Sequence, residues 1–192
     1  MNKRLLKTMS FVIGVGLSGM FAQTELPRGA EAAPQKAAQL SVTDENFLNE
    51  AAIGGQFEVE AGKIAERASD PRIKNFGARM VKDHSAAGAK LKRIAAAKGA
   101  MVPQQLDAKH AQIRDRLASL KGAEFDREYI QEMVKDHDED AQTFTDAAQN
   151  VNDPQIKRFA ADTLRVIQAH DKMAHEIATS MNASGSSAAR TR

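Results

Sequence analysis

Four long segments of this chain repeat apolar residues every three or four positions, at about residues 44–68, 70–98, 124–149 and 154–181. This spacing places the apolar side chains on one face of an α-helix, so each segment is predicted to be an amphipathic helix. Four apolar faces in one chain must pack against one another to leave water. No segment alternates apolar and polar residues as a strand does. The predicted fold class is therefore all-α.

Residues that cap or begin helices divide these segments. Asp70-Pro71 and Asp153-Pro154 each place an N-cap residue before a proline at the first helical position. Ser41 or Thr43 is expected to cap the first helix, and a shorter helix is expected over about residues 105–120. Two short connections and one long one predict a four-helix bundle of ferritin-like type. It would consist of two antiparallel hairpins, with a long crossover that carries the short extra helix.

An internal repeat relates the two predicted hairpins. The segment Asp70–Phe76 is similar to Asp153–Phe159, and Met-Val-Lys-Asp-His occurs at both Met80–His84 and Met133–His137. Only two units exist, which excludes a solenoid of many repeats.

Two adjacent glycines interrupt the first predicted helix, at Gly54-Gly55. Each glycine lowers helix stability by roughly 1 kcal/mol relative to alanine. We expect them to allow a neighbouring helix to approach closely, and a local distortion of the helix near a site is the alternative.

Each of the four long helices carries one metal-type ligand on its apolar face, namely Glu58, His84, His137 and His170. Such groups are costly to bury without a partner. At 1.5 Å per residue, the two ligands of each hairpin lie within about one helical turn of the same level. Imidazoles with a carboxylate suit Zn, Fe or Cu. The sequence predicts a site for one divalent transition metal. The alternative is a Glu–His hydrogen-bond network without metal.

Three aspartates are predicted to lie close to these ligands in the sequence or on the same face. Asp83 and Asp136 each precede a histidine, which turns them about 100° away from the apolar face, so they are predicted to be either hydrogen-bond partners of the ligands or surface residues. Asp140 lies on the apolar face three positions after a histidine and is also a reserve ligand. His110 and His175 fall outside the apolar faces and are expected to be solvated.

Composition excludes several other functions. The chain has no cysteine, so a thiol nucleophile and a disulfide framework are both excluded. No glycine-rich phosphate loop follows a strand. Once residues 1–32 are set aside, Lys and Arg equal Asp and Glu in number, which gives no support for a nucleic-acid partner. No catalytic residues are predicted.

The beginning of the chain is typical of a secretory signal. Met1–Lys7 is basic, Met9–Ala22 is apolar, and Ala30-Glu31-Ala32 offers a cleavage site between small residues. The alternatives are cleavage after Ala22 and an uncleaved N-terminal anchor. We expect an exported protein, periplasmic or extracellular, whose mature part has no membrane-spanning segment. The predicted organisation is a signal over residues 1–32, a flexible lead over 33–42, the bundle over 43–181 and a disordered tail over 182–192.

Several blocks of this sequence resemble a known bacterial family. They are Phe47–Ala52, Gly55–Val59, Met80–His84, Phe125–Tyr129 and Met133–His137, followed by His170. The family comprises exported domain-of-unknown-function proteins of the ferritin-like superfamily, often labelled "predicted outer membrane protein". The resemblance implies a helical bundle outside the cytoplasm that binds metal.

One departure from ferritins bears on the chemistry. Their di-iron centres resemble Glu-x-x-His pairs, but Val81, Val134 and Ile167 stand three positions before the histidines here. A di-iron oxidase is therefore disfavoured, and a mononuclear centre or a degenerate bundle without metal fits better. The leading hypothesis is metal storage, buffering or sensing in the envelope. The alternative is a metal-independent structural or stress-related interaction protein of the envelope. Either protein could form a homo-oligomer.

Overall fold

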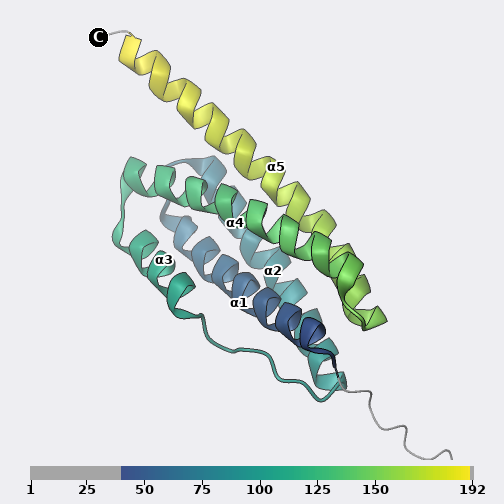
Figure 1. Ribbon diagram of the computed structural model, residues 1–192. Helices are drawn as coiled ribbons and strands as arrows, with labels where there is room; N and C mark the ends of the chain where they lie inside the picture. Colours follow the sequence, from purple (N-terminus) through teal and green to yellow (C-terminus); the bar gives the residue numbers. More distant parts are fainter. Residues whose placement is uncertain (1–39, 191–192) are drawn as a thin grey trace, which may run out of the picture. The chain divides into compact units, whose positions relative to one another are not determined.

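The structure is a computed structural model that describes residues 40–190, with side chains described through residue 183. All regular secondary structure in this part of the chain is helical, as predicted (Figure 1). The helices are α1 (Val42–Ile64), η1 (Ala65–Arg67), α2 (Pro71–Ala97), α3 (Ala108–Ser119), α4 (Gly122–Asn150) and α5 (Pro154–Arg190). The predicted signal and most of the flexible lead lie outside the described residues.

Two hairpins form a four-helix bundle. α1 packs along α2 and α4 packs along α5, and these two pairs make the most extensive contacts between helices. The crossover between α2 and α4 carries α3, which packs against α1 (Figure 1). The predicted bundle of two hairpins with a short extra helix is therefore confirmed.

Two buried aspartates tie each hairpin to the turn of the other. Asp126 of α4 accepts hydrogen bonds from the backbone N–H groups of Ser69 and Asp70, both at 2.9 Å. Asp44 of α1 accepts one from the backbone of Asn152 at 2.8 Å. This reciprocal arrangement agrees with the internal repeat and fixes both turns against the bundle.

Replacing Asp126 with alanine is expected to lower the free energy of unfolding by about 1–3 kcal/mol, because two backbone donors lose their acceptor. Chemical denaturation measures the change. The matched control is Glu124→Ala, since Glu124 is exposed two positions earlier in the sequence. Equal stability of the two variants would show that the capping bonds contribute nothing.

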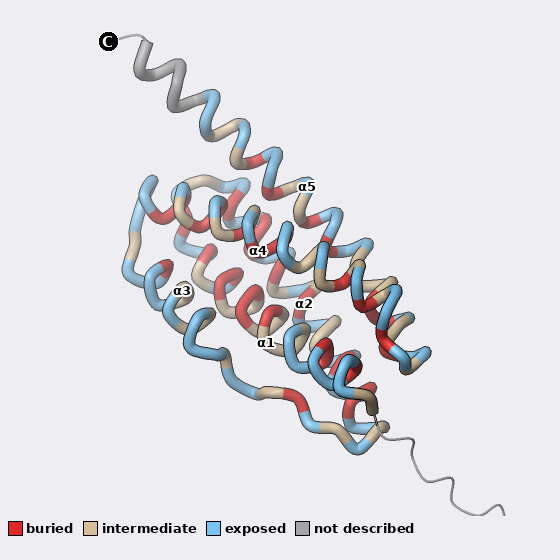
Figure 2. The backbone as a smooth tube through the Cα atoms, in the orientation of Figure 1, coloured by how far each residue is buried: buried red, intermediate tan, exposed pale blue. Residues whose placement is uncertain are grey.

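Hydrophobic side chains form two clusters with a polar layer between them. One cluster extends toward the α1–α2 turn and includes Phe76 and Tyr129. The other extends toward the α4–α5 turn and includes Phe144 and Phe159. The buried residues recur along the helices of the bundle (Figure 2). On α2, α4 and α5, the predicted metal ligand falls in sequence between residues of the two clusters, and on α1 Glu58 directly follows Phe57 of the first cluster.

The close approach of helices lies at other glycines than predicted. A Cβ on Gly62 would lie 2.6 Å from the Gly77 carbonyl oxygen, and a Cβ on Gly77 would lie 2.4 Å from the Ala65 Cβ. By contrast, a Cβ on Gly54 would make only an ordinary contact, and one on Gly55 would meet nothing within 4 Å. The prediction for Gly54-Gly55 is therefore wrong, and the tight crossing of α1 and α2 lies about two turns further along α1, at Gly62.

The last helix is longer than predicted. The sequence predicts a disordered tail after Met181, whereas the backbone of α5 is helical to Arg190. Residues 182–190 contain three alanines and no proline, so no residue there prevents the helix from continuing. None of the described helices combines the length and hydrophobicity that crossing a membrane requires.

Candidate metal centre

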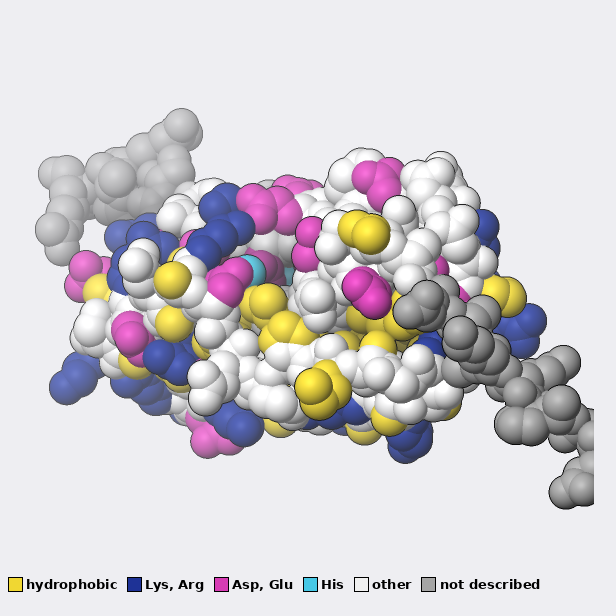
Figure 3. All heavy atoms as spheres, turned by 60° about the horizontal axis from the view of Figure 1, so that its bottom comes forward, with side chains coloured by type: hydrophobic (Ala, Val, Ile, Leu, Met, Phe, Trp, Pro, Cys, Tyr) yellow, Lys and Arg dark blue, Asp and Glu magenta, His cyan; other side chains and the backbone are white. Residues whose placement is uncertain are grey.

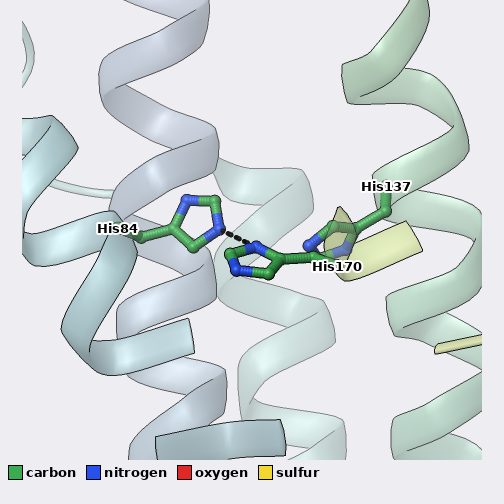
Figure 4. A group of neighbouring side chains, drawn as sticks. All are labelled: His84, His137 and His170. Carbon is green, nitrogen blue, oxygen red and sulfur yellow. Dashed lines mark hydrogen bonds between the residues drawn. The ribbon is translucent and has the colours of Figure 1, made fainter. Parts of the chain in front are cut away.

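Four side chains from four helices meet in the middle of the bundle, and they are Glu58 of α1, His84 of α2, His137 of α4 and His170 of α5. Glu58 Oε2 lies 2.5 Å from His84 Nδ1, and Glu58 Oε1 lies 3.2 Å from His137 Nε2. His84 Nε2 lies 3.2 Å from His170 Nδ1. Figure 4 shows the three imidazole rings gathered between the helices that carry them. The structure thus brings together all four predicted ligands.

Burial keeps these groups neutral. Glu58, His137 and His170 are fully buried, and His84 is 5% exposed. Removal from water lowers the pKa of His84 to about 4 and that of His137 to about 3. It also lowers the pKa of His170 to about 4, against the opposing effect of the bond to Asp83. The same burial raises the pKa of Glu58 well above its usual value. Without a cation, the centre therefore holds neutral imidazoles and a protonated carboxyl.

Hydrogen bonds determine which ring nitrogen of His137 and of His170 carries the proton. His137 Nδ1 lies 2.9 Å from the Met133 carbonyl oxygen, which can only accept, so Nδ1 carries the proton and Nε2 is free. His170 Nε2 lies 3.0 Å from Asp83 Oδ2. Burial raises the pKa of Asp83, but the bond to His170 and the charge of Arg79 more than offset this, so Asp83 is ionised and accepts. His170 Nδ1 is then unprotonated and can accept a hydrogen bond from His84 Nε2, which lies 3.2 Å away.

Several buried polar atoms of these and neighbouring side chains have no hydrogen bond. Within the described residues, both oxygens of Glu58, Nε2 of His137, one oxygen of Asp136 and the Tyr129 hydroxyl are buried and make no hydrogen bond. Glu58 contacts two imidazoles, but neither contact is aligned as a hydrogen bond. Unsatisfied buried polar atoms are costly and rare in proteins.

The donor set fits a transition metal. One nitrogen from each of His84, His137 and His170 lies within 4.8 Å of the other two. Bonds of about 2.0–2.1 Å in a tetrahedron separate ligand atoms by roughly 3.3 Å. The 3.2 Å separations of His84 Nε2 from His170 Nδ1 and of Glu58 Oε1 from His137 Nε2 match that spacing, whereas the 2.5 Å between Glu58 Oε2 and His84 Nδ1 is shorter. To share one cation, Glu58 and His84 would have to move relative to each other, because Glu58 contacts His84 Nδ1 whereas His170 contacts His84 Nε2.

The three predicted neighbouring aspartates occupy different positions. Asp83 bonds His170, as expected for a partner that orients a ligand. Asp136 is 9% exposed, and one of its oxygens lies within 4.8 Å of ligand-type atoms of Glu58 and His137. Burial, followed by the proximity of Glu58, raises the pKa of Asp136 well above its usual value and that of Asp140 to about 8. Asp136 is thus buried close to the centre and does not lie on the surface. Its metal-related role stays a prediction.

Sequence reasoning missed one residue of the centre, Tyr129. Its hydroxyl is buried, and burial together with the nearby Glu58 and Asp136 raises its pKa. Tyr129, Met133 and His137 are spaced by four, so the sequence contains a signal that places this side chain on the same face of α4.

The other two histidines lie apart from the three core imidazoles. His175 is exposed, as predicted, and lies 3.5 Å from Asp138 and 3.4 Å from Asp171. His110 is more buried than predicted, with 16% of its side chain exposed and a 2.7 Å contact to Asp107. The exposed group around His175 has ligand-type atoms close together. Its members already pair with one another as ordinary surface charges do.

The fold and the buried Glu/His centre define a ferritin-like helical bundle with a candidate metal site. Residues 29–177 match the family described as domain of unknown function DUF4142, and the chain belongs to that family. The resemblance seen in the sequence is thereby confirmed. No curated protein matches the chain.

Solved structures of similar fold come from other families. A DUF305 fragment from Deinococcus radiodurans has a TM-score of 0.65 at 9% identity, over 73% of this chain and 98% of that chain. A DUF305 protein from Streptomyces coelicolor, described as secreted, has a TM-score of 0.60 at 13% identity, over 70% and 91%. CopM in its Cu(II)-bound form has a TM-score of 0.62 at 19% identity, over 72% and 97%. CopM is also known in Cu(I)-bound and silver-bound forms. At these identities the similarity establishes the fold alone.

Proposed function

We propose that this protein is an exported bundle that binds one transition metal ion through Glu58, His84, His137 and His170. Storage, buffering or sensing of metal in the envelope would be its role. The observation that carries the proposal is the set of buried atoms of Glu58 and His137 that have no hydrogen bond and face two further imidazoles. The signal-like beginning of the sequence and the secreted DUF305 neighbour support export.

The ligand chemistry narrows the choice of metal. Imidazoles with one carboxylate suit Zn and Cu(II), whereas Cu(I) and silver prefer sulfur ligands. The fold neighbour CopM binds copper and silver, which supports copper as a candidate for this chain. Charged side chains of both signs are mixed on the face drawn in Figure 3, which gives no support for a nucleic-acid partner.

We expect the purified protein to bind one metal ion per chain, measured by elemental mass spectrometry and titration calorimetry. His84→Ala and His137→Ala should each weaken binding by about 100-fold. A four-ligand site contributes roughly 10–16 kcal/mol, so one ligand contributes about a quarter of that. His175→Ala is the matched control, because His175 is exposed and lies outside the centre. Equal, sub-stoichiometric amounts of metal in the wild type and in the variants would disprove the proposal.

The second candidate is a metal-independent envelope bundle whose polar layer sets helix register. The chain of contacts from His84 through His170 to Asp83 favours it, since these groups can bond one another without metal. The melting temperature of the protein with and without a chelator distinguishes the two functions. A bound metal raises the melting temperature by mass action, whereas the second candidate predicts no change.

A further inference from the structure

A groove of about 470 Å³ lies between α1 and α2 on the outside of the bundle and reaches the candidate centre at His84. Gly55 of α1 and Gly88 of α2 line it, together with longer polar side chains such as Gln56 and Lys92. His84 is nearly buried, so the groove touches the centre at a single edge.

A much smaller cavity of about 10 Å³ lies deeper in the bundle. Glu58, His84 and Asp140 line its polar side. Gly55, Gly88 and His84 line both the groove and this cavity, so the two spaces adjoin at the glycines. A cavity of this size holds roughly one water molecule.

The two glycines leave space that a side chain would fill. A Cβ on Gly55 or Gly88 would meet no atom within 4 Å, so neither glycine is needed for helix packing. Each nevertheless lowers helix stability by roughly 1 kcal/mol relative to alanine. The carboxylate oxygens of Glu58 on the inner cavity are buried and make no hydrogen bond, which independently indicates a ligand at this place.

We propose that the gap between Gly55 and Gly88 is the path by which a single metal ion, stripped of most of its water, enters the centre. This inference rests on the proposed metal-binding function. The inner cavity is too small for an organic chelate, so chelators and metal complexes stop in the groove. The ion must therefore leave the centre before a chelator can capture it.

Stopped-flow exchange of Cu(II) and Zn(II) on the whole protein tests the path. Gly88→Leu fills the gap and is expected to slow both loading and release by about tenfold or more, a barrier increase of about 1.4 kcal/mol, with the dissociation constant unchanged. Gly88→Ala should exchange close to the wild-type rate. Ala86→Leu adds the same leucine at an exposed position of α2 and should leave exchange unchanged. In wild type, release into a bulky chelator should not depend on chelator concentration.

Each outcome separates the path from the function. If the wild type binds no metal, the proposed function itself fails. If it binds metal but Gly88→Leu exchanges as fast as Ala86→Leu, the path is overturned and the function stands. Should Gly88→Leu fail to fold, Gly55→Leu on the facing helix replaces it. A release rate that rises in proportion to chelator concentration in wild type also overturns the path.

Discussion

A Glu58→Gln variant is expected to bind metal about 100-fold more weakly, while its metal-free form melts within about 2–4 °C of wild type. Burial raises the pKa of Glu58 well above its usual value, so the metal-free carboxyl is already neutral. Glutamine has nearly the same shape and is also neutral, so the metal-free protein loses little. A metal ion needs the anion, which glutamine cannot supply. Titration calorimetry and thermal melting in chelator measure the two effects.

The matched control for this variant is Glu66→Gln, an exposed glutamate in η1. It should change neither affinity nor melting temperature. Wild-type affinity in Glu58→Gln would remove Glu58 from the ligand set. A large drop in the melting temperature of metal-free Glu58→Gln would instead show that the ionised carboxylate stabilises the fold without metal.

Much of the fold could be predicted because local signals determine it. The N-cap Asp70 accepts a bond from the Arg72 backbone, and Pro71 begins α2, both as the sequence indicates. The tight crossing at Gly62 and Gly77 could not be predicted, since it depends on how two helices meet. The sequence drew attention instead to the adjacent pair Gly54-Gly55.

The four core-facing ligand candidates could be predicted for a related reason. Each of the four helices carries one histidine or glutamate on its apolar face, at a similar height along the bundle. Because the apolar faces pack against one another, these four side chains are expected to meet in a shared centre. The burial of Asp136 was not predictable from its angle on α4 alone. Asp136 lines a surface pocket together with Asp107 and His110 of the crossover, and a helix pattern carries no information about which segment covers it.

The metal-free protein is expected to lose stability as the pH rises from about 6.5 to about 8. Burial raises the pKa values of Glu58, Asp136 and Asp140, that of Asp140 to about 8, so the folded state holds protons on buried carboxyls at higher pH than free carboxyls do. The unfolded chain has already lost those protons, so the folded state binds more. Each retained proton lowers the free energy of unfolding by about 1.4 kcal/mol per pH unit.

The histidines act in the opposite direction, but only below about pH 6.5. There the unfolded chain protonates them, whereas the folded state, with pKa values of about 3 to 4, does not. The histidines therefore contribute less to the free energy of unfolding as the pH decreases. Between about pH 4.5 and 6.5 this change offsets the change contributed by the carboxyls. The free energy of unfolding of the metal-free protein should be nearly constant in that window.

A bound cation should reverse the decrease in the free energy of unfolding at higher pH. It stabilises the ionised carboxylate of Glu58, so binding displaces a proton and the affinity rises by about tenfold per pH unit for each proton displaced. Urea denaturation between pH 5.5 and 8, in chelator and with saturating metal, measures both slopes. Asp140→Asn should flatten the metal-free slope, because it removes one retained proton. If metal-free wild type becomes more stable from pH 6.5 to 8, the buried carboxyls are ionised in the folded state, and a neutral metal-free centre is wrong.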